Sequence, residues 1–303
     1  MCLARSFGLL LMGFGLSSLG CDRIEALKDQ LVSSSKPEVG ESPELAAIRS
    51  LYQGGKYDEA LQTIGAAVQK YPGMAEAFYF KGLCHLARAG GADLKAPLSE
   101  EEVLGLEAFE RALSINPRHA LSSIGIGDLY SRRVPARRRR AGASEDPQDP
   151  YVLAISAYEK AVTIDPKLPE AQQRYALFLE RTGQLDQAET AYKAAVEAAA
   201  VVPEIAPDYY LAYGRFLAGP RDRLTEALEQ FELALVFRQG DVAIEQEIAI
   251  VHSRVGLRHL ERQEYLMAEQ ALKQAQALFP DASIPEAQKT TAALEELRSI
   301  RRR

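Results

Sequence analysis

The stretch AYEKAVTIDPKLPEA, residues 157–171, decides the fold because it nearly repeats AFERALSINPRHALS, residues 108–122. Each stretch reads aromatic, charged, charged, Ala, apolar, Ser or Thr, Ile, Asp or Asn, Pro and then a basic residue. Related stretches that place Ala five residues before Pro end at Pro72 and Pro280. A phrase that recurs in this way indicates internal repeats, and the repeat must be established before any other structural feature.

Each repeated stretch carries small and large side chains at helical spacing. Before Pro166, the residues Ala154, Tyr158 and Ala161 are separated by four and then three positions, so they share one face of a helix. The small residues allow a second helix to approach closely, the large residue fills the space beside them, and the proline ends the helix. Such a partner helix is predicted upstream of the repeated stretches, where glycine occurs at corresponding positions: Gly82, Gly127 and Gly256.

These helix pairs resemble the tetratricopeptide repeat, a helix–turn–helix unit of 34 residues. The resemblance extends over roughly residues 41–280 and implies an all-α fold, a right-handed superhelix of about six helix–turn–helix repeats. The prolines are more than 34 residues apart where insertions rich in Gly, Pro and charge are predicted, near residues 89–101 and 132–150. Residues 281–303 are expected to form a capping helix and a basic tail, because the last repeat would otherwise expose its apolar face.

The first twenty residues have the pattern of an export signal. One basic residue precedes an apolar stretch that is shorter than the roughly 20 residues of a membrane-spanning helix. The sequence LSSLGC, in which Gly20 precedes Cys21, resembles the lipobox of bacterial lipoproteins, and this resemblance implies that Cys21 is acylated. An ordinary signal peptide followed by a chance cysteine is the alternative. We therefore predict a lipoprotein signal peptide over residues 1–20 and a lipidated cysteine with a tether over residues 21–40.

Composition and motifs argue against several classes of function. A net charge of −6 gives no reason to expect nucleic acid as a partner. The four histidines are scattered, and none has a companion at the spacing of metal ligands. The sequence also lacks the GxSxG, phosphate-loop and HExxH motifs of common enzyme families. We therefore expect no enzyme activity, no metal, no cofactor and no small-molecule substrate.

The resemblance to tetratricopeptide repeats also implies where partners bind. In that family, partners contact a concave surface at positions two, five, nine and twelve of the first helix in each repeat. The set suits an amphipathic helix or an extended apolar segment, although several of its members could instead pack against the neighbouring repeat. Mapped onto this sequence, the set comprises Leu45, Arg49, Tyr52, Tyr79, Leu83, Ile124, Asp128, Gln173 and Leu177, with Glu180, Leu211 and Arg215 further along the chain.

An arginine-rich run in the second predicted insertion is the most distinctive local feature. The functional interpretation is a basic loop that docks an acidic protein, lipid headgroups or a cell-wall polymer. The alternative, which we favour, is a solvated insertion that its own acidic end partly neutralises. The run SRRVPARRRR supplies Arg132, Arg133, Arg137, Arg138, Arg139 and Arg140.

A lipid anchor, a tether and a repeat array together predict a non-enzymatic interaction scaffold or assembly factor. The architecture is similar to lipoproteins that help type IV pilus secretins multimerise, and to repeat lipoproteins of gliding-motility and outer-membrane assembly machines. A cell-wall-associated adaptor that recruits envelope hydrolases is the alternative. Both interpretations imply a lipid-anchored protein of the bacterial cell envelope, for which we favour the outer membrane facing the periplasm. The expected partners are other envelope proteins, bound on the concave surface, and the membrane, contacted through the lipid at Cys21.

Overall fold

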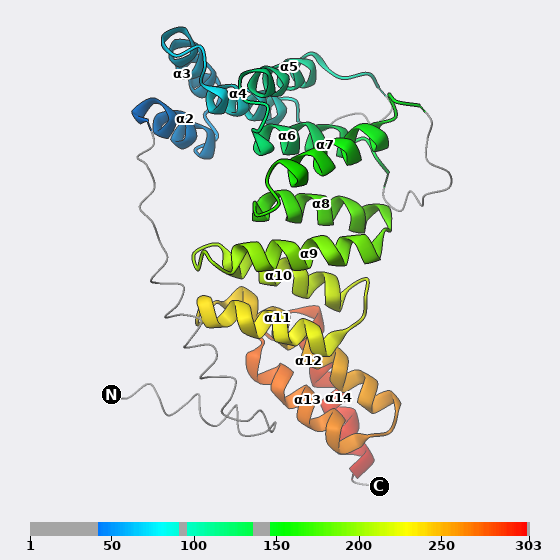
Figure 1. Cartoon of the computed structure of the whole chain (residues 1–303). Helices are drawn as coiled ribbons and strands as arrows, with labels where there is room; N and C mark the ends of the chain where they lie inside the picture. The colour runs from blue at the N-terminus through cyan, green and yellow to red at the C-terminus, as the bar shows by residue number, and fades with distance from the viewer. Residues whose placement is uncertain (1–41, 91–95, 136–145, 302–303) are drawn as a thin grey trace. The chain divides into compact units, whose positions relative to one another are not determined.

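The computed structural model describes residues 42–90, 96–135 and 146–301, and these residues form thirteen α-helices and no β-strand (Figure 1). The predicted all-α repeat fold is therefore confirmed for the part of the chain that is described. The predictions for the signal peptide, for Cys21 with its tether and for Arg137 to Arg140 lie outside the described residues.

Twelve of the described helices form six consecutive pairs, which follow one another along the chain (Figure 1). Each pair consists of a first and a second helix that pack against each other, and each pair is one repeat. The pairs are α2 (Pro43–Gln53) with α3 (Tyr57–Lys70), α4 (Ala75–Arg88) with α5 (Glu100–Ile115), α6 (Ala120–Ser131) with α7 (Pro150–Ile164), α8 (Pro169–Thr182) with α9 (Leu185–Ala199), α10 (Ala206–Ala218) with α11 (Leu224–Phe237), and α12 (Val242–Glu261) with α13 (Tyr265–Leu278).

Glycine in the first helix meets a ring of the second helix, and this contact brings the two helices together. A Cβ atom added at Gly82 would lie 2.5 Å from the ring of Phe109, and one added at Gly127 would lie 2.7 Å from the ring of Tyr158. Side chains at these positions would force the helices apart, so only glycine permits the observed approach. The glycine of each first helix and the aromatic residue of each second helix thus form the two sides of one packing contact.

The first helices of successive repeats contact one another. Contacts join α2 to α4, α4 to α6, α6 to α8, and α8 to α10, whereas within the described residues the second helices make no comparable contacts with each other. The first helices therefore lie closer together than the second helices do. We call the accessible surface of α2, α4, α6, α8 and α10 the inner surface.

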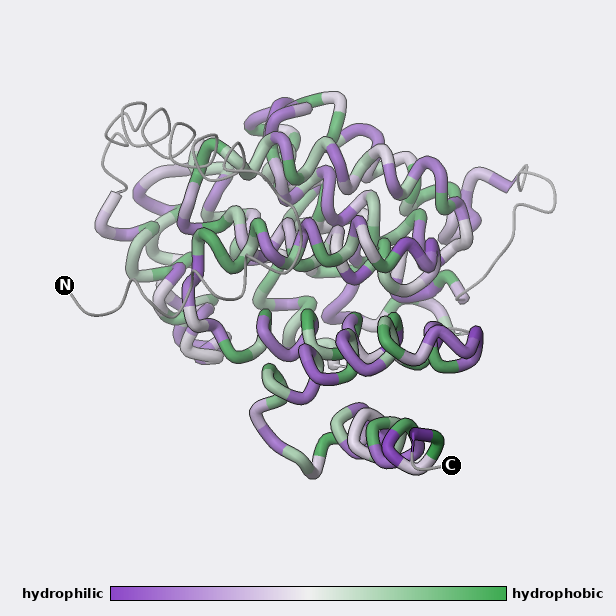
Figure 2. Tube along the Cα trace, turned by 90° about the horizontal axis from the view of Figure 1, so that it is seen from below, coloured by the Kyte–Doolittle hydropathy of each residue, from purple (hydrophilic) through white to green (hydrophobic). Residues whose placement is uncertain are grey.

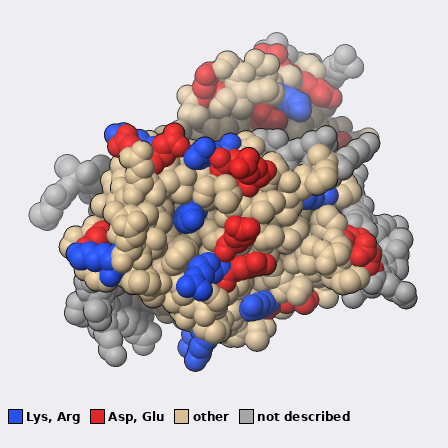
Figure 3. All heavy atoms as spheres, turned by 90° about the horizontal axis from the view of Figure 1, so that it is seen from above, with Lys and Arg blue, Asp and Glu red and all other residues tan. Residues whose placement is uncertain are grey.

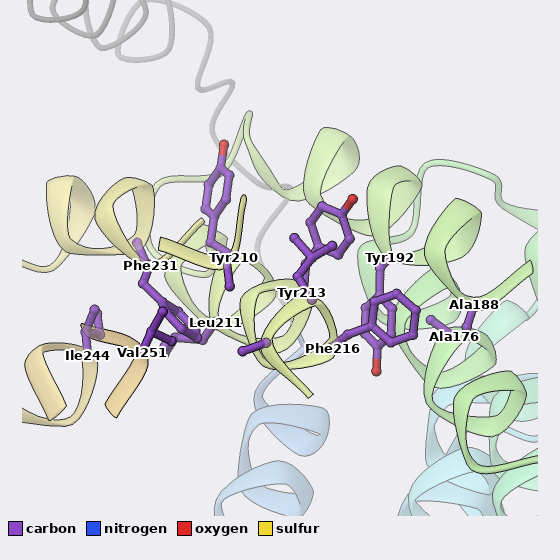
Figure 4. Packing of buried hydrophobic residues seen from close by; sticks show 14 of the residues in the cluster. Ala176, Ala188, Tyr192, Tyr210, Leu211, Tyr213, Phe216, Phe231, Ile244 and Val251 are labelled. Carbon is purple, nitrogen blue, oxygen red and sulfur yellow. The ribbon is translucent and has the colours of Figure 1, made fainter. Parts of the chain in front are cut away.

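The buried core is continuous through the later repeats. One hydrophobic cluster joins the fourth, fifth and sixth repeats, and it includes Tyr192 and Phe216, whose ring centroids are 4.9 Å apart (Figure 4). Along each helix, hydrophobic and hydrophilic residues alternate at short intervals, as expected of helices that bury one face and expose the other (Figure 2). The repeats are thus held together by side-chain packing between neighbours, which is the basis of stability in solenoids.

The last helix, α14 (Pro285–Arg301), closes the array. It packs against α12 and α13, in the place that the first helix of a further repeat would occupy. Its buried face includes Ala287, Leu294 and Leu297, and polar residues cover the remainder. The predicted capping helix is confirmed, and it shields the apolar side of the sixth repeat. None of the described helices combines the length and the hydrophobicity that crossing a bilayer requires.

Candidate functional site

Arg174 of α8 lies at the centre of a polar cluster on the inner surface. Its Nη1 lies 3.5 Å from Oδ2 of Asp128, its Nη2 lies 3.9 Å from Oε1 of Glu170, and its side chain is 46% exposed. Both distances exceed the roughly 2.7–2.9 Å of a charge-assisted hydrogen bond. Within the described chain, no hydrogen bond uses the donors of Arg174. The guanidinium therefore keeps its N–H groups available to solvent or to a ligand.

The charge of Arg174 acts on four tyrosines. Tyr52 of α2, Tyr79 of α4, Tyr158 of α7 and Tyr209 of α10 all have a raised pKa, chiefly because burial disfavours the phenolate. The positive charge of Arg174 acts in the opposite direction on the pKa of all four phenols, so all four lie within its electrostatic reach. Together with α8 itself, these side chains come from five of the six repeats. We call Arg174, Asp128, Glu170 and these four tyrosines the Arg174 cluster.

The hydroxyl groups on the inner surface remain donors at neutral pH, because a raised pKa keeps each phenol protonated. Tyr158 uses its hydroxyl within the protein, where it donates a 2.6 Å hydrogen bond to Oδ1 of Asp128. The hydroxyls of Tyr52, Tyr79 and Tyr209 form no hydrogen bond with any described residue. Together with Arg174, they make the inner surface rich in unpaired donors.

Two carboxylates of first helices accept hydrogen bonds from tyrosines of second helices. The Tyr158 hydroxyl binds Asp128, and the Tyr192 hydroxyl donates a 2.6 Å hydrogen bond to Oε2 of Glu180. Both rings are almost completely buried, so packing fixes the position of each hydroxyl. The two carboxylates are thereby prevented from turning freely, and the inner surface keeps a defined arrangement of charge.

Glu170 is the least compensated member of the Arg174 cluster. Burial raises the pKa of its carboxyl group, the charge of Arg174 lowers it, and the charge of Asp128 raises it further. No described residue donates a hydrogen bond to Glu170. Its carboxylate therefore provides an acceptor beside the donors of Arg174.

A pocket of about 420 Å³ opens between α6 and α8 beside Arg174. Leu177 contributes an apolar wall and is 45% exposed. The guanidinium of Arg181 packs over the ring of Phe178 and donates to the backbone oxygen of Ser131. The lining residues are Asp128, Ser131, Tyr158, Arg174, Leu177, Phe178, Glu180 and Arg181.

Charge elsewhere on the surface is mixed. On the face drawn in Figure 3, acidic and basic side chains are interspersed rather than gathered into one large patch. Within the described residues, no group of three His, Cys, Asp or Glu side chains could hold a metal ion. The Arg174 cluster is therefore distinguished by its convergence on one site and by its unpaired hydrogen-bonding groups, not by net charge.

The residues predicted for the groove differ in how accessible they are. Asp128, Leu177 and Glu180 line the pocket together. The side chains of Leu45, Tyr52, Tyr79 and Leu83 are half-buried against the hydrophobic cluster of the first two repeats. Gln173 is half-buried, Arg49 is exposed, and Arg215 is exposed but pairs with Glu247 at 2.6 Å.

Tyr79 is as much a packing residue as a surface residue. Its ring centroid lies 5.4 Å from that of Phe80, 6.1 Å from that of Phe109 and 5.5 Å from that of His119. Contacts of this kind tie the second repeat to the third. The ring of Tyr79 is therefore occupied by packing, and its hydroxyl forms no hydrogen bond with a described residue.

Two of the predicted groove residues do not offer a binding surface. Ile124 is 3% exposed and Leu211 is 8% exposed, and each belongs to a hydrophobic cluster that spans neighbouring repeats. Both stand at the fifth position of their repeat. Their burial agrees with the alternative that members of the set pack against neighbouring repeats, and the assignment of the set to partner binding stays a prediction.

Sequence reasoning missed Arg174 and Glu170, which define the centre of the cluster. The chosen positions on α8 were Gln173, Leu177 and Glu180, and Arg174 lies one residue further along the same helix. A shift of one residue turns a side chain by about 100° around the helix axis. The spacing of Glu170 and Arg174, four residues apart and opposite in charge, was the available signal for a shared face.

Arg133 is not part of an accessible basic loop. Its Nη2 lies 2.7 Å from Oε2 of Glu102, and the two side chains are only 6% and 3% exposed. The guanidinium also donates to the backbone oxygens of Ala96 and Pro97, in the insertion between α4 and α5. The prediction of an accessible basic loop is therefore wrong for Arg133, because its side chain is buried in contacts with the other insertion and with Glu102. Arg132 is exposed, with Nη1 3.5 Å from the backbone oxygen of Leu86.

Comparisons with known proteins agree with this architecture. Residues 45–94 and residues 145–207 each match a sequence model of the tetratricopeptide repeat. No curated protein matches the chain.

Solved structures resemble the chain over most of its length. The C-terminal part of a tetratricopeptide repeat-containing protein from Cytophaga hutchinsonii is 15% identical, with a TM-score of 0.54 over 89% of this chain and 93% of that chain. Human IFIT1, in a dimer with PPP-AAAA, is 17% identical, with a TM-score of 0.56 over 85% of this chain and 54% of that chain. At such identities the likeness concerns the fold alone. The two matched ranges and the repeated packing contacts show that the chain contains tetratricopeptide repeats.

Proposed function

We propose that the protein is a non-enzymatic scaffold that binds a segment of a partner protein on its inner surface, around Arg174. The tetratricopeptide repeat fold supports a role in protein–protein interaction in general. The observation that carries the proposal is the exposed guanidinium of Arg174 on the inner surface, 3.5 Å from Asp128 and 3.9 Å from Glu170. Its charge also acts on the hydroxyls of Tyr52, Tyr79 and Tyr209, which form no hydrogen bond with a described residue. An exposed leucine and an open pocket beside that guanidinium add apolar contact area.

The scaffold is further proposed to be anchored in the bacterial cell envelope by a lipid on Cys21, in the outer membrane facing the periplasm. The resemblance of LSSLGC to a lipobox supports this part of the proposal. A lipid-anchored repeat array suits an assembly factor of an envelope machine, such as a type IV pilus secretin, a gliding-motility complex or an outer-membrane assembly complex. An adaptor that recruits envelope hydrolases is the alternative with the same architecture.

Affinity capture with a groove variant tests the proposal. Full-length wild type, Arg174→Met and the control Arg262→Met are used as baits in detergent-solubilised envelopes, and mass spectrometry quantifies the proteins that co-purify. Arg262 is exposed at the turn between α12 and α13, outside the inner surface. The expected result is that Arg174→Met captures at least about tenfold less of the partner protein than wild type does, whereas Arg262→Met captures as much as wild type.

The identity of the captured proteins distinguishes the assembly factor from the adaptor. Secretin, motility or outer-membrane assembly subunits favour the assembly factor, and hydrolases favour the adaptor. Equal capture of the same proteins by wild type and Arg174→Met would show that the inner surface is not the binding site.

A further inference from the structure

We propose that the first turn of α13 is a membrane-binding surface, whose apolar side chains enter the interface of an anionic lipid bilayer. The surface consists of Tyr265, Leu266 and Met267, which we call the α13 tip. This inference goes beyond the proposed function, because the α13 tip lies on a second helix and takes no part in binding at the inner surface. Its basis is exposed apolar area with cationic side chains beside it.

The α13 tip exposes large apolar side chains to solvent. Leu266 is 72% exposed, more than any other large hydrophobic side chain of the described residues, and Met267 is 54% exposed. Leu266 precedes the buried Ala268 by two residues, or about 200° around the helix axis, so it lies on the face of α13 that points away from the core. Both α12 and α14 pack against α13 but leave this face uncovered (Figure 1).

The other repeats that lack an insertion carry polar residues where α13 carries Leu266 and Met267. The positions are counted back from the small buried residue near the start of each second helix, which is Ala268 in α13. The equivalent pairs are Asp58 and Glu59 in α3, Asp186 and Gln187 in α9, and Thr225 and Glu226 in α11. The repeat fold therefore does not require apolar residues at these positions, and packing does not account for Leu266 and Met267. Clustered apolar residues on a surface are typical of a binding site.

Cationic side chains gather one turn further along α13. Glu269 lies three residues after Leu266, and it forms ion pairs with Lys273 of the same helix and with Arg301 of α14. The pKa of Glu269 is lowered, chiefly by the hydrogen bond from Lys273 and further by the charges of Arg301 and Arg298. Three cations thus surround one carboxylate, which leaves two positive charges in excess, and such an excess attracts an anionic lipid surface.

A lipid surface fits the α13 tip better than a second copy of the chain does. Specific protein–protein interfaces bury roughly 1,200 Å² or more, and three side chains contribute only a small part of that area. Interfacial binding to a bilayer needs less: apolar side chains enter the boundary of the acyl chains while neighbouring cations stay at the headgroups. The α13 tip and the cations around Glu269 supply these two parts side by side.

A tryptophan placed at the α13 tip reports its depth, because the sequence contains no tryptophan of its own. The full-length variants Leu266→Trp and Val201→Trp are reconstituted from detergent into vesicles of phosphatidylethanolamine and phosphatidylglycerol, with and without bromine on the acyl chains. Bromine quenches only a tryptophan that reaches those chains. Val201 is the matched control, since it is 59% exposed and Glu204 is the one charged residue in its turn, residues 200–205. Fluorescence is read from the vesicles after flotation.

The expected quenching depends on position and on charge. Brominated chains should quench the tryptophan of Leu266→Trp about twofold or more and leave that of Val201→Trp unquenched. Adding Arg298→Gln and Arg301→Gln to Leu266→Trp should remove at least about half of the quenching, because each arginine near an anionic surface contributes to binding.

Three outcomes would overturn the proposal. Absence of quenching in Leu266→Trp, or equal quenching of both tryptophans, would exclude the α13 tip as a membrane-binding surface. A blue shift that grows with protein concentration, without quenching by lipid, would identify a second copy of the chain as the occupant. Quenching that persists after both arginines are replaced would exclude the anionic lipid as the partner. None of these outcomes bears on binding at the inner surface.

Discussion

The guanidinium of Arg133 donates a 2.7 Å hydrogen bond to the carboxylate of Glu102, in a buried ion pair that joins the second insertion to the first turn of α5. Glu102 also completes the capping box at the start of α5, where it accepts from the backbone N–H of Ser99. Burial raises the pKa of Glu102, but the hydrogen bonds from Ser99 and Arg133 outweigh it, so the net shift is downward. The ion pair thus fixes the position at which the second insertion leaves α6.

Removing the guanidinium of Arg133 should strongly destabilise the protein. Replacing Arg133 with Met leaves the Glu102 carboxylate buried without its partner, and the expected loss in free energy of unfolding is about 3 kcal/mol. Urea denaturation at pH 7 measures the loss. The control is Arg132→Met, one residue away and exposed, which should change stability by less than about 0.5 kcal/mol. Equal effects of the two substitutions would contradict the structural role assigned to Arg133.

Protonation of the Glu189 carboxylate should lower the free energy of unfolding in acid. Burial would raise the pKa of this carboxyl group, but hydrogen bonds from Arg223, Lys193 and Arg221 lower it from 4.5 to about 2. Because the folded pKa is depressed, the stabilisation is complete above about pH 5 and is lost as the pH falls towards 2. Urea titrations at pH 7 and pH 3 should show that Glu189→Gln removes roughly 2 kcal/mol of this dependence. The exposed control Glu107→Gln should leave the dependence unchanged.

Two glycine-to-alanine substitutions should have opposite signs. At Gly82 a Cβ would lie 2.5 Å from the Phe109 ring, so Ala should destabilise the protein by about 1–3 kcal/mol through overpacking. At Gly65, in the middle of α3, nothing lies within 4 Å of the added atom, so Ala should stabilise by about 0.5–1 kcal/mol. Chemical denaturation distinguishes the two. A stable Gly82→Ala protein would mean that α4 and α5 are not held at the observed separation.

Two substitutions at Tyr79 should distinguish its role in packing from its role in binding. Tyr79→Phe keeps the ring against Phe80, Phe109 and His119, so it should melt like wild type while capturing severalfold less of the partner protein from detergent-solubilised envelopes. Tyr79→Ala removes the ring as well and should lower stability by about 3 kcal/mol. Thermal melts and partner capture are measured on the same preparations. Wild-type affinity in a stable Tyr79→Phe protein would remove its hydroxyl from the binding surface.

Cys21→Ser should release the protein from the membrane fraction. The thioether lipid requires the cysteine sulfur, so the variant should also take up no fatty-acid probe. Fractionation and metabolic labelling of wild type and variant check both effects, with Cys84→Ser as the control because that thiol is buried. A membrane-bound Cys21→Ser protein, together with unlabelled wild type, would contradict lipidation.

The repeat architecture was predictable because the signals that specify it are local. Ala154, Tyr158 and Ala161 lie within about two turns of one helix, and Pro166 comes five residues after Ala161, so their spacing alone defines a packing face and an end. The capping helix follows from the same reasoning, since an array of stacked repeats must cover its last apolar face. Accessibility on the inner surface was less predictable, and Ile124 shows why: a side chain at a groove position is buried when the next first helix lies over it.

By itself the sequence therefore determined the helix pairs, their order and the cap, because helical spacing, glycine and proline act over a few residues. Tertiary structure alone decided that Arg174 lies beside Asp128 of the preceding repeat and that Arg133 reaches Glu102. These residues lie on different repeats and approach one another only through the rotation of each helix about its axis and the packing of each repeat on the next. No periodicity in the sequence records those rotations, and an error of one residue moves a side chain by about 100°.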